Sequence, residues 1–280
     1  MQKRLNAPIV YGRLSEAKKT NTAWGNKRPL FSDWGELKAT GTLVQFSSKT
    51  TYSNWGDIKS ENLCLVEKGS GVIEFNGKHY QVGCGHVFKV FPGQKPLVCP
   101  NNSLSVLSIR IPGSAQKAEQ AGEDLSSIKV VNPADVPAKV YEYETLGQEI
   151  ITCDYNPGIG LLRFTFPIDR IPIHIHPFSA RLIRVISGLG YTYLDPNRYK
   201  MDEDAYCLFP KGAIHTNGPV PGSVYTVYAV QLPWIDPKID EEHIGGDQKF
   251  VRYVESEPPK ILWKKKEELK RAVEKLGHET

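Results

Sequence analysis

Three histidines stand at spacings that suit the binding of one divalent metal ion. His174 and His176 are two residues apart, and His215 closes the segment Pro210-Lys211-Gly212-Ala213-Ile214-His215. On a β-strand, residues i and i+2 point to the same face, so His174 and His176 can turn into one cavity. Imidazole binds Fe, Ni, Cu and Zn, and a site of three histidines leaves positions open for water or substrate. The pattern predicts a metal held by His174, His176 and His215.

The elements that position these histidines are predicted to be short β-strands. Alternating or continuous apolar runs of five to seven residues are broken by Gly, Pro and Asn throughout the chain. Asn76-Gly77, between two such runs, is typical of a hairpin turn. The pattern also recurs once: Gly188 lies 119 positions after Gly69, and Phe209-Pro210 lies 118 positions after Phe91-Pro92. The sequence therefore predicts an all-β chain built from two similar halves.

The histidine motifs resemble those of the cupin family. The segment from His174 to Gly188 is similar to the first cupin motif, and Pro210 to His215 is similar to the second, PxGxxH. The resemblance implies double-stranded β-helix (jelly-roll) barrels with a metal in the barrel mouth, here two barrels in one chain, a bicupin. Two positions depart from the family pattern. Arg181 stands where the family has a glutamate ligand, and Asp204 and Pro219 stand where the second motif has Gly and Asn.

The resemblance and the internal repeat together predict the division of the chain. Trp55 and Asp57 fall opposite His174 and His176, so the first barrel is expected to keep the fold without a metal site. The stretch Trp263 to Leu276 has the apolar spacing of an amphipathic helix. The expected units are an irregular leader (1–40), an N-terminal barrel without metal (41–112), a connector (113–150), a metal-binding C-terminal barrel (151–236) and a tail that contains the helix (237–280).

Arg181 bears most directly on the substrate. Three neutral imidazoles leave a divalent metal with its full charge, and an arginine beside it adds a planar fork that matches a carboxylate or phosphate. One interpretation makes Arg181 the anchor of a small anionic substrate. The other makes it the partner of an acidic neighbour such as Asp154 or Asp169, because a buried arginine needs a partner in either case.

Three functions fit this pattern. Three-histidine sites without the glutamate resemble those of cupin thiol dioxygenases, which favours a mononuclear non-haem iron dioxygenase. A non-redox isomerase, epimerase or lyase would use Zn²⁺, Ni²⁺ or Mn²⁺ as a Lewis acid on a sugar-like or carboxylate substrate. A non-catalytic bicupin would only bind a small molecule. We expect an enzyme and not a sensor, because no helix-turn-helix or other output domain accompanies the barrels. Fe²⁺ is the favoured metal because of the resemblance to the thiol dioxygenases.

Composition narrows the partners and the compartment. The net charge of +4 is small and spread over 280 residues, which argues against a dedicated nucleic-acid binder. The first residues are not followed by an apolar run, and no stretch is long enough to span a membrane, so neither a signal peptide nor a membrane anchor is expected. Five cysteines without CxxC spacing favour free thiols and a cytoplasmic protein. Open barrel edges make a homodimer the expected assembly.

Overall fold

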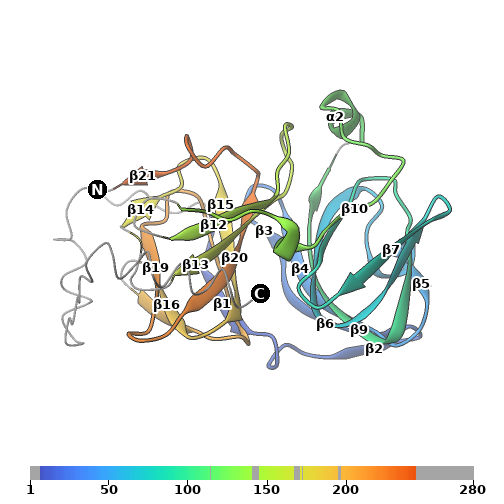
Figure 1. Cartoon of the computed structure of the whole chain (residues 1–280), viewed down its shortest axis with the longest axis horizontal. Helices are drawn as coiled ribbons and strands as arrows, with labels where there is room; N and C mark the ends of the chain where they lie inside the picture. The colour runs from blue at the N-terminus through green and yellow to red at the C-terminus, as the bar shows by residue number, and fades with distance from the viewer. Residues whose placement is uncertain are drawn as a thin grey trace.

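The computed structural model describes residues 7–113, 115–140, 145–166, 171, 173–194 and 197–243. Within these ranges the chain is mostly β-strand, which confirms the predicted all-β class. The strands gather in two lobes that lie side by side (Figure 1). The helix predicted for residues 263–276 lies outside the described residues.

The first lobe is one large antiparallel sheet, in the order β10-β8-β6-β9-β4-β3-β2, with β5 paired to β9 and β7 paired to β6. Its strands, in chain order, are β2 (Thr20–Thr22), β3 (Gly25–Trp34), β4 (Ala39–Phe46), β5 (Thr50–Thr51), β6 (Ser60–Phe75), β7 (Lys78–Gly83), β8 (Val87–Val90), β9 (Leu97–Pro112) and β10 (Lys129–Val131).

The second lobe contains two sheets. One runs in the order β1-β18-β15-β20-β13-β12-β11 and the other in the order β17-β16-β19-β14-β21. Their strands are β1 (Val10–Arg13), β11 (Lys139–Val140), β12 (Leu146–Ile151), β13 (Gly160–Phe166), β14 (His174–Ile175), β15 (Ala180–Ser187), β16 (Gly190–Leu194), β17 (Asn197–Met201), β18 (Ala205–Phe209), β19 (His215–Pro219), β20 (Tyr225–Leu232) and β21 (Glu242–His243).

Helices within the described residues are short. They are α1 (Tyr52–Trp55), α2 (Ala115–Gln120) and one 3₁₀ turn, Pro133–Asp135, which is capped by the side chain of Asn132. Among the described residues, no helix has the length and apolar character needed to cross a membrane.

Strand pairing follows the internal repeat that the sequence predicted. In the first lobe Asn62 on β6 lies between Val90 on β8 and Arg110 on β9. In the second lobe Arg181 on β15 lies between Phe209 on β18 and Gln231 on β20.

Two glycines repeat in the same way. Gly69 has φ of 81° and Gly188 has φ of 83°. A Cβ on Gly69 would lie 2.0 Å from the carbonyl oxygen of Ser103, and one on Gly188 would lie 1.9 Å from that of Val224. Both turns therefore need glycine for its backbone conformation and for the close approach of the neighbouring strand.

The leader expected to be irregular is instead built into both lobes. β2 and β3 extend the first sheet, and β1 pairs with β18 at the edge of the second. Arg13 fixes β1 by ion pairs to Asp202 (2.9 Å) and Asp204 (3.1 Å). An isolated strand leaves its backbone groups unpaired, so the pairing partners, distant in sequence, decide the conformation of this segment.

The connector contributes one edge strand to each lobe. β10 pairs with β8 of the first lobe, and β11 pairs with β12 of the second. The last part of the predicted connector, from Leu146 onward, belongs to β12 and is therefore part of the second lobe's sheet.

One hydrophobic core joins the lobes. Strands with both faces buried contribute alternate side chains to it, since successive residues of a strand point to opposite faces. From the first lobe come Leu63, Leu65, Leu107 and Ile109, and from the second come Leu161, Leu182, Leu208 and Val230, all buried in the same cluster.

A buried ion pair reinforces the junction of the lobes. Lys89 on β8 and Glu61 on β6 are both fully buried and lie 2.8 Å apart. From the second lobe, the hydroxyl of Tyr155 and the backbone N–H of Ile159 donate to Glu61 at 2.5 and 2.6 Å. Lys89 in turn donates to the carbonyl of Ile159 at 3.3 Å. Both charges are therefore compensated by partners that span the two lobes.

Removal of Lys89 should destabilise the protein strongly. Lys89→Met leaves the carboxylate of Glu61 buried without its cation, and such a change costs about 3–5 kcal/mol. The matched control is Lys211→Met, because Lys211 pairs with Glu36 at the surface and such pairs contribute roughly 0–1 kcal/mol. Urea denaturation of both variants measures the difference, and equal unfolding free energies would contradict the assignment.

Candidate metal centre

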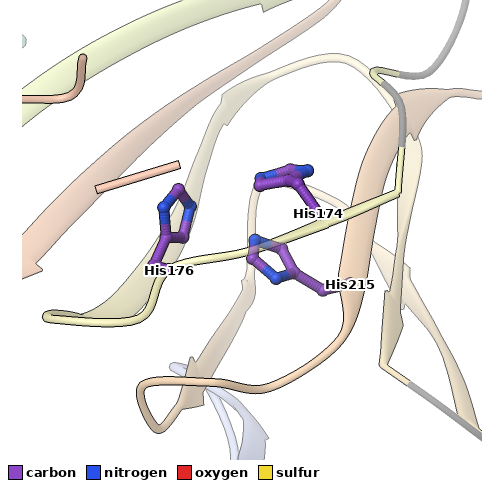
Figure 2. A group of neighbouring side chains, drawn as sticks. All are labelled: His174, His176 and His215. Carbon is purple, nitrogen blue, oxygen red and sulfur yellow. The ribbon is translucent and has the colours of Figure 1, made fainter. Parts of the chain in front are cut away.

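The structure brings the three predicted histidines together. His174 on β14 lies opposite His215 on β19 in the antiparallel ladder, and His176 follows β14 directly. One ring nitrogen from each can be chosen so that all three lie within 4.8 Å of one another. Figure 2 shows the three rings gathered around a common space. All three side chains are buried, which places the cluster inside the lobe.

Backbone carbonyls fix the tautomers of two of the rings. Nδ1 of His176 lies 2.6 Å from the carbonyl oxygen of Asp240, and Nδ1 of His215 lies 2.9 Å from that of Ala213. A carbonyl oxygen can only accept, so Nδ1 donates in both cases and Nε2 keeps its lone pair. Metal-binding histidines characteristically donate their other ring N–H in this way. The donor set therefore fits a divalent metal.

Burial keeps the histidines neutral. The pKa of His176 lies well below its usual 6.5, first because of desolvation and then because Arg181, His215 and His174 are close. The pKa of His215 is also well below the usual value, chiefly through desolvation and then through His174. Neutral imidazole is the form that binds a metal, so both side chains are prepared to act as ligands.

The cluster lies in a cavity of about 590 Å³ whose inner wall is apolar. The apolar wall comes from strands of the seven-stranded sheet and from Ile171, and consists of Leu162, Phe164, Phe166, Ile171, Ile183, Val227 and Ala229. Charged side chains line other parts of the cavity and are Glu149, Asp236, Lys238, Glu241 and Glu242. A small molecule with one polar end and an apolar body matches this division.

Arg181 faces the cavity, as expected at the position of the family's glutamate ligand, but its guanidinium is already engaged. It is 3% exposed and donates to the carboxylate of Asp240 at 3.0 Å and to the hydroxyl of Ser179. Burial lowers the pKa of Arg181 to about 10, although Asp240 opposes that shift, so the group stays charged at neutral pH. Of the two interpretations, the structure shows the ion pair with an acidic neighbour, which is Asp240 and not Asp154. Asp169, the other neighbour named from the sequence, lies outside the described residues, and the role of substrate anchor stays a prediction.

Asp240 is the site residue that sequence analysis missed. It lies after the last long strand, outside both cupin motifs, and no local pattern marks it. Its carboxylate is fully buried and also accepts from the backbone N–H groups of Phe178 (2.9 Å) and Ser179 (3.2 Å). Its neighbour on the chain, β21, pairs with β14, and there His243 stands opposite His174 in the ladder.

Sequence comparison finds a distant relative. No family model matches the chain. A germin-like protein, subfamily 1 member 3, of Arabidopsis thaliana is 28% identical over 184 residues, which cover 57% of this chain and 71% of that protein.

Structural comparison is more informative. A putative glyoxylate-induced protein from Pseudomonas aeruginosa has a TM-score of 0.64 at 12% identity, with coverage of 82% of this chain and 90% of that one. A cupin 2 conserved barrel domain protein from Leptotrichia buccalis has a TM-score of 0.52 at 12% identity, covering 82% and 92%. A point mutant of Bacillus subtilis oxalate decarboxylase has a TM-score of 0.58 at 10% identity, covering 88% and 84%. The chain therefore has the jelly-roll fold of the cupins.

The buried histidines predict a pH dependence of stability in the chelated, metal-free protein. Below pH 6.5 the unfolded chain binds protons at His176 and His215 that the folded chain does not bind. Each histidine should therefore lower the unfolding free energy by about 1.4 kcal/mol per pH unit as the pH falls from about 6.5. Urea denaturation at about pH 7.5, 6.5 and 5.5 measures the slope. His215→Gln should reduce that slope by about 1.4 kcal/mol per pH unit, the contribution of one histidine. An unchanged slope would contradict the prediction.

Proposed function

We propose that this chain is a metal-dependent cupin enzyme that acts on a small anionic substrate, with mononuclear non-haem iron dioxygenase chemistry favoured. One observation carries the proposal. Three buried imidazoles meet inside a cavity with one apolar wall, and backbone carbonyls hold two of them with Nε2 available. Such a donor set, with positions left for water or substrate, is typical of catalytic metal sites.

His174, His176 and His215 would hold the metal. When bound, it would supply a redox centre or a Lewis acid, according to its identity. The protein's own contribution is to fix the ligands and to keep water away. Ala213 and Asp240 set the ring orientations through their carbonyls, and the apolar wall lowers the local dielectric, which strengthens every charge interaction inside.

The support for an anionic substrate now rests on the ligands and not on Arg181. Three neutral imidazoles leave a divalent metal with its full charge, which favours an oxygen anion at an open position. Lys238 is a further cation among the lining residues, beside the carboxylates of Glu149, Asp236, Glu241 and Glu242. The body of the substrate would lie against Phe164 and Phe166, whose ring centroids are 6.2 Å apart. A small carboxylate or enolate with an apolar substituent could bind the metal through its oxygen atoms and pack its substituent against the apolar wall.

The absence of a carboxylate among the three clustered ligands favours Fe²⁺ and a dioxygenase, through the resemblance to three-histidine cupins. The second candidate is a non-redox enzyme that uses Zn²⁺, Ni²⁺ or Mn²⁺. The structural similarity to an enzyme named as an oxalate decarboxylase supports that candidate, because decarboxylation of a small carboxylate would place the same group at the metal.

The first lobe is proposed to be a barrel of the same origin that has no metal site, which makes the chain a bicupin divided near residues 41–112 and 151–236. Large aromatic side chains pack in its interior. Trp55, at the repeat position of His174, packs edge-on against Phe46 and Tyr52, with ring centroids 5.2 and 4.9 Å apart. All three rings are buried in one cluster. A cytoplasmic homodimer remains part of the proposal, and a non-catalytic binding protein remains the third candidate.

Removal of one histidine should remove the metal but not the fold. His215→Ala should lower the metal content at least tenfold, because three ligands become two. Far-ultraviolet circular dichroism should stay unchanged, since the cores are apolar. The matched control is His79→Ala, whose side chain is 63% exposed in the first lobe. Elemental analysis of protein purified without chelator measures both.

The identity of the metal separates the candidates. Iron together with O₂ consumption that depends on an added small carboxylate or enolate would support the dioxygenase. Zinc, nickel or manganese without O₂ consumption would support the non-redox enzyme. Metal-free wild-type protein that cannot be loaded with Fe²⁺, Zn²⁺, Ni²⁺ or Mn²⁺ would contradict the proposed function.

A further inference from the structure

The chain beyond β20 forms one wall of the histidine cavity. Asp236, Pro237, Lys238, Glu241 and Glu242 all line it, and they come from a stretch outside both cupin motifs. Most of this stretch is polar, and Ile239 is 65% exposed. Apolar packing therefore does not explain why the stretch stays over the cavity.

Asp240 attaches this wall to the lobe. It is the one residue of 236–242 that is completely buried. Its Oδ1 accepts from the backbone N–H groups of Phe178 and Ser179, and its Oδ2 accepts from Arg181 and from the hydroxyl of Ser179. A buried carboxylate is stabilised by this many donors, whereas the same group without them would be expelled.

Arg181 completes the network from the opposite side. Besides Asp240 and Ser179, it donates to the amide oxygen of Gln231 at 2.6 Å when that amide is oriented to satisfy both of its ends. Its guanidinium also lies 3.0 Å from Nδ1 of His176, but Nδ1 already donates to the carbonyl of Asp240, so this is a contact between two donors and not a hydrogen bond. The ion pair therefore connects strands β15 and β20 to the wall.

The same residue that carries the carboxylate also supplies the carbonyl that holds His176. The carbonyl oxygen of Asp240 accepts from Nδ1 of His176 at 2.6 Å. The position of this carbonyl depends on where the residue's side chain is anchored. The carboxylate of Asp240 thus fixes both the wall and the orientation of a ring in the histidine cluster.

We propose that Asp240 and Arg181 are positioning residues: their ion pair holds the wall 236–242 over the cavity and sets the ring of His176 for metal binding. The proposal rests on the proposed metal site. In this chain Arg181 stands where cupins have a glutamate ligand, and the nearby carboxylate is that of Asp240, which pairs with Arg181 and is not one of the clustered ligands. It would act on the metal only through the ring of His176, which the carbonyl of Asp240 holds, so the metal would keep its open positions for substrate.

Loss of the carboxylate should weaken metal binding and loosen the wall. Asp240→Ala should raise the Kd for Co²⁺ by about 10–100-fold, the usual effect of removing a group that orients a ligand. The visible absorption bands of bound Co²⁺ should shift, because the ring of His176 loses its fixed orientation. In metal-free protein, amide hydrogen exchange over residues 236–242 should become at least tenfold faster. Ile239→Ala, the neighbouring exposed side chain, is the control and should change none of these.

A double-mutant cycle separates positioning from folding. Asp240→Asn leaves Arg181 buried without its anion, and Arg181→Gln leaves Asp240 without its cation, so each should weaken Co²⁺ binding. The double variant removes both charges and should bind Co²⁺ at least threefold more tightly than the product of the single effects predicts. A purely multiplicative result would overturn the proposal. So would a double variant that does not fold, because the pair would then belong to the fold and not to the site.

The outcomes also distinguish this proposal from the proposed function. If wild-type protein binds no Co²⁺, the metal site itself fails. If wild-type protein binds Co²⁺ and Asp240→Ala binds it with the same Kd and the same absorption spectrum, the metal site stands and the positioning role is wrong. Unchanged hydrogen exchange of the wall in Asp240→Ala would overturn the part of the proposal that concerns the wall.

Discussion

The site depends on a sheet that is buried on both faces. Along β15, Leu182 points into the core shared by the two lobes, while Arg181, Ile183 and Val185 point the other way, toward the second lobe's interior. Because side chains alternate along a strand, a shift of one residue in the register would exchange these two faces. The packing of the lobes against each other therefore fixes which residues reach the cavity. The first lobe supports the site in this way.

The second requirement is electrostatic. Burying Arg181 removes its hydration, and the energy is recovered only if an anion lies beside it. Asp240 meets that need from outside the barrel strands, and Ser179 and Gln231 complete the hydrogen bonds. A glutamate at position 181, as the family pattern has it, would here face the carboxylate of Asp240 at close range. Arg181 therefore depends on Asp240 for its counter-charge, and the chain after β20 depends on Arg181 for the partner of its buried carboxylate.

The sequence predicted what local spacing controls and missed what distant pairing controls. The histidine cluster could be predicted from the two-residue spacing of His174 and His176 together with the PxGxxH segment. The offset near 119 predicted which positions repeat. Asn62 on β6 and Arg181 on β15 accordingly hold equivalent positions in the strand pairing of their two lobes. β1 was missed because its partner, β18, lies in the distant second half of the chain. Asp240 was missed because only the folded chain brings it beside Arg181.

The two lobes differ at the interior positions that the internal repeat makes equivalent. Asn62 takes the place of Arg181 in the first lobe and is fully buried, where it accepts from the hydroxyl of Ser108 at 3.0 Å. Because that amide is neutral, it needs no buried anion of the kind that Asp240 provides for the arginine. Trp55, at the repeat position of His174, packs against Phe46 and Tyr52 in the hydrophobic core of the first lobe. The two lobes thus share their register and their turn glycines, and they differ in the side chains at these repeated interior positions.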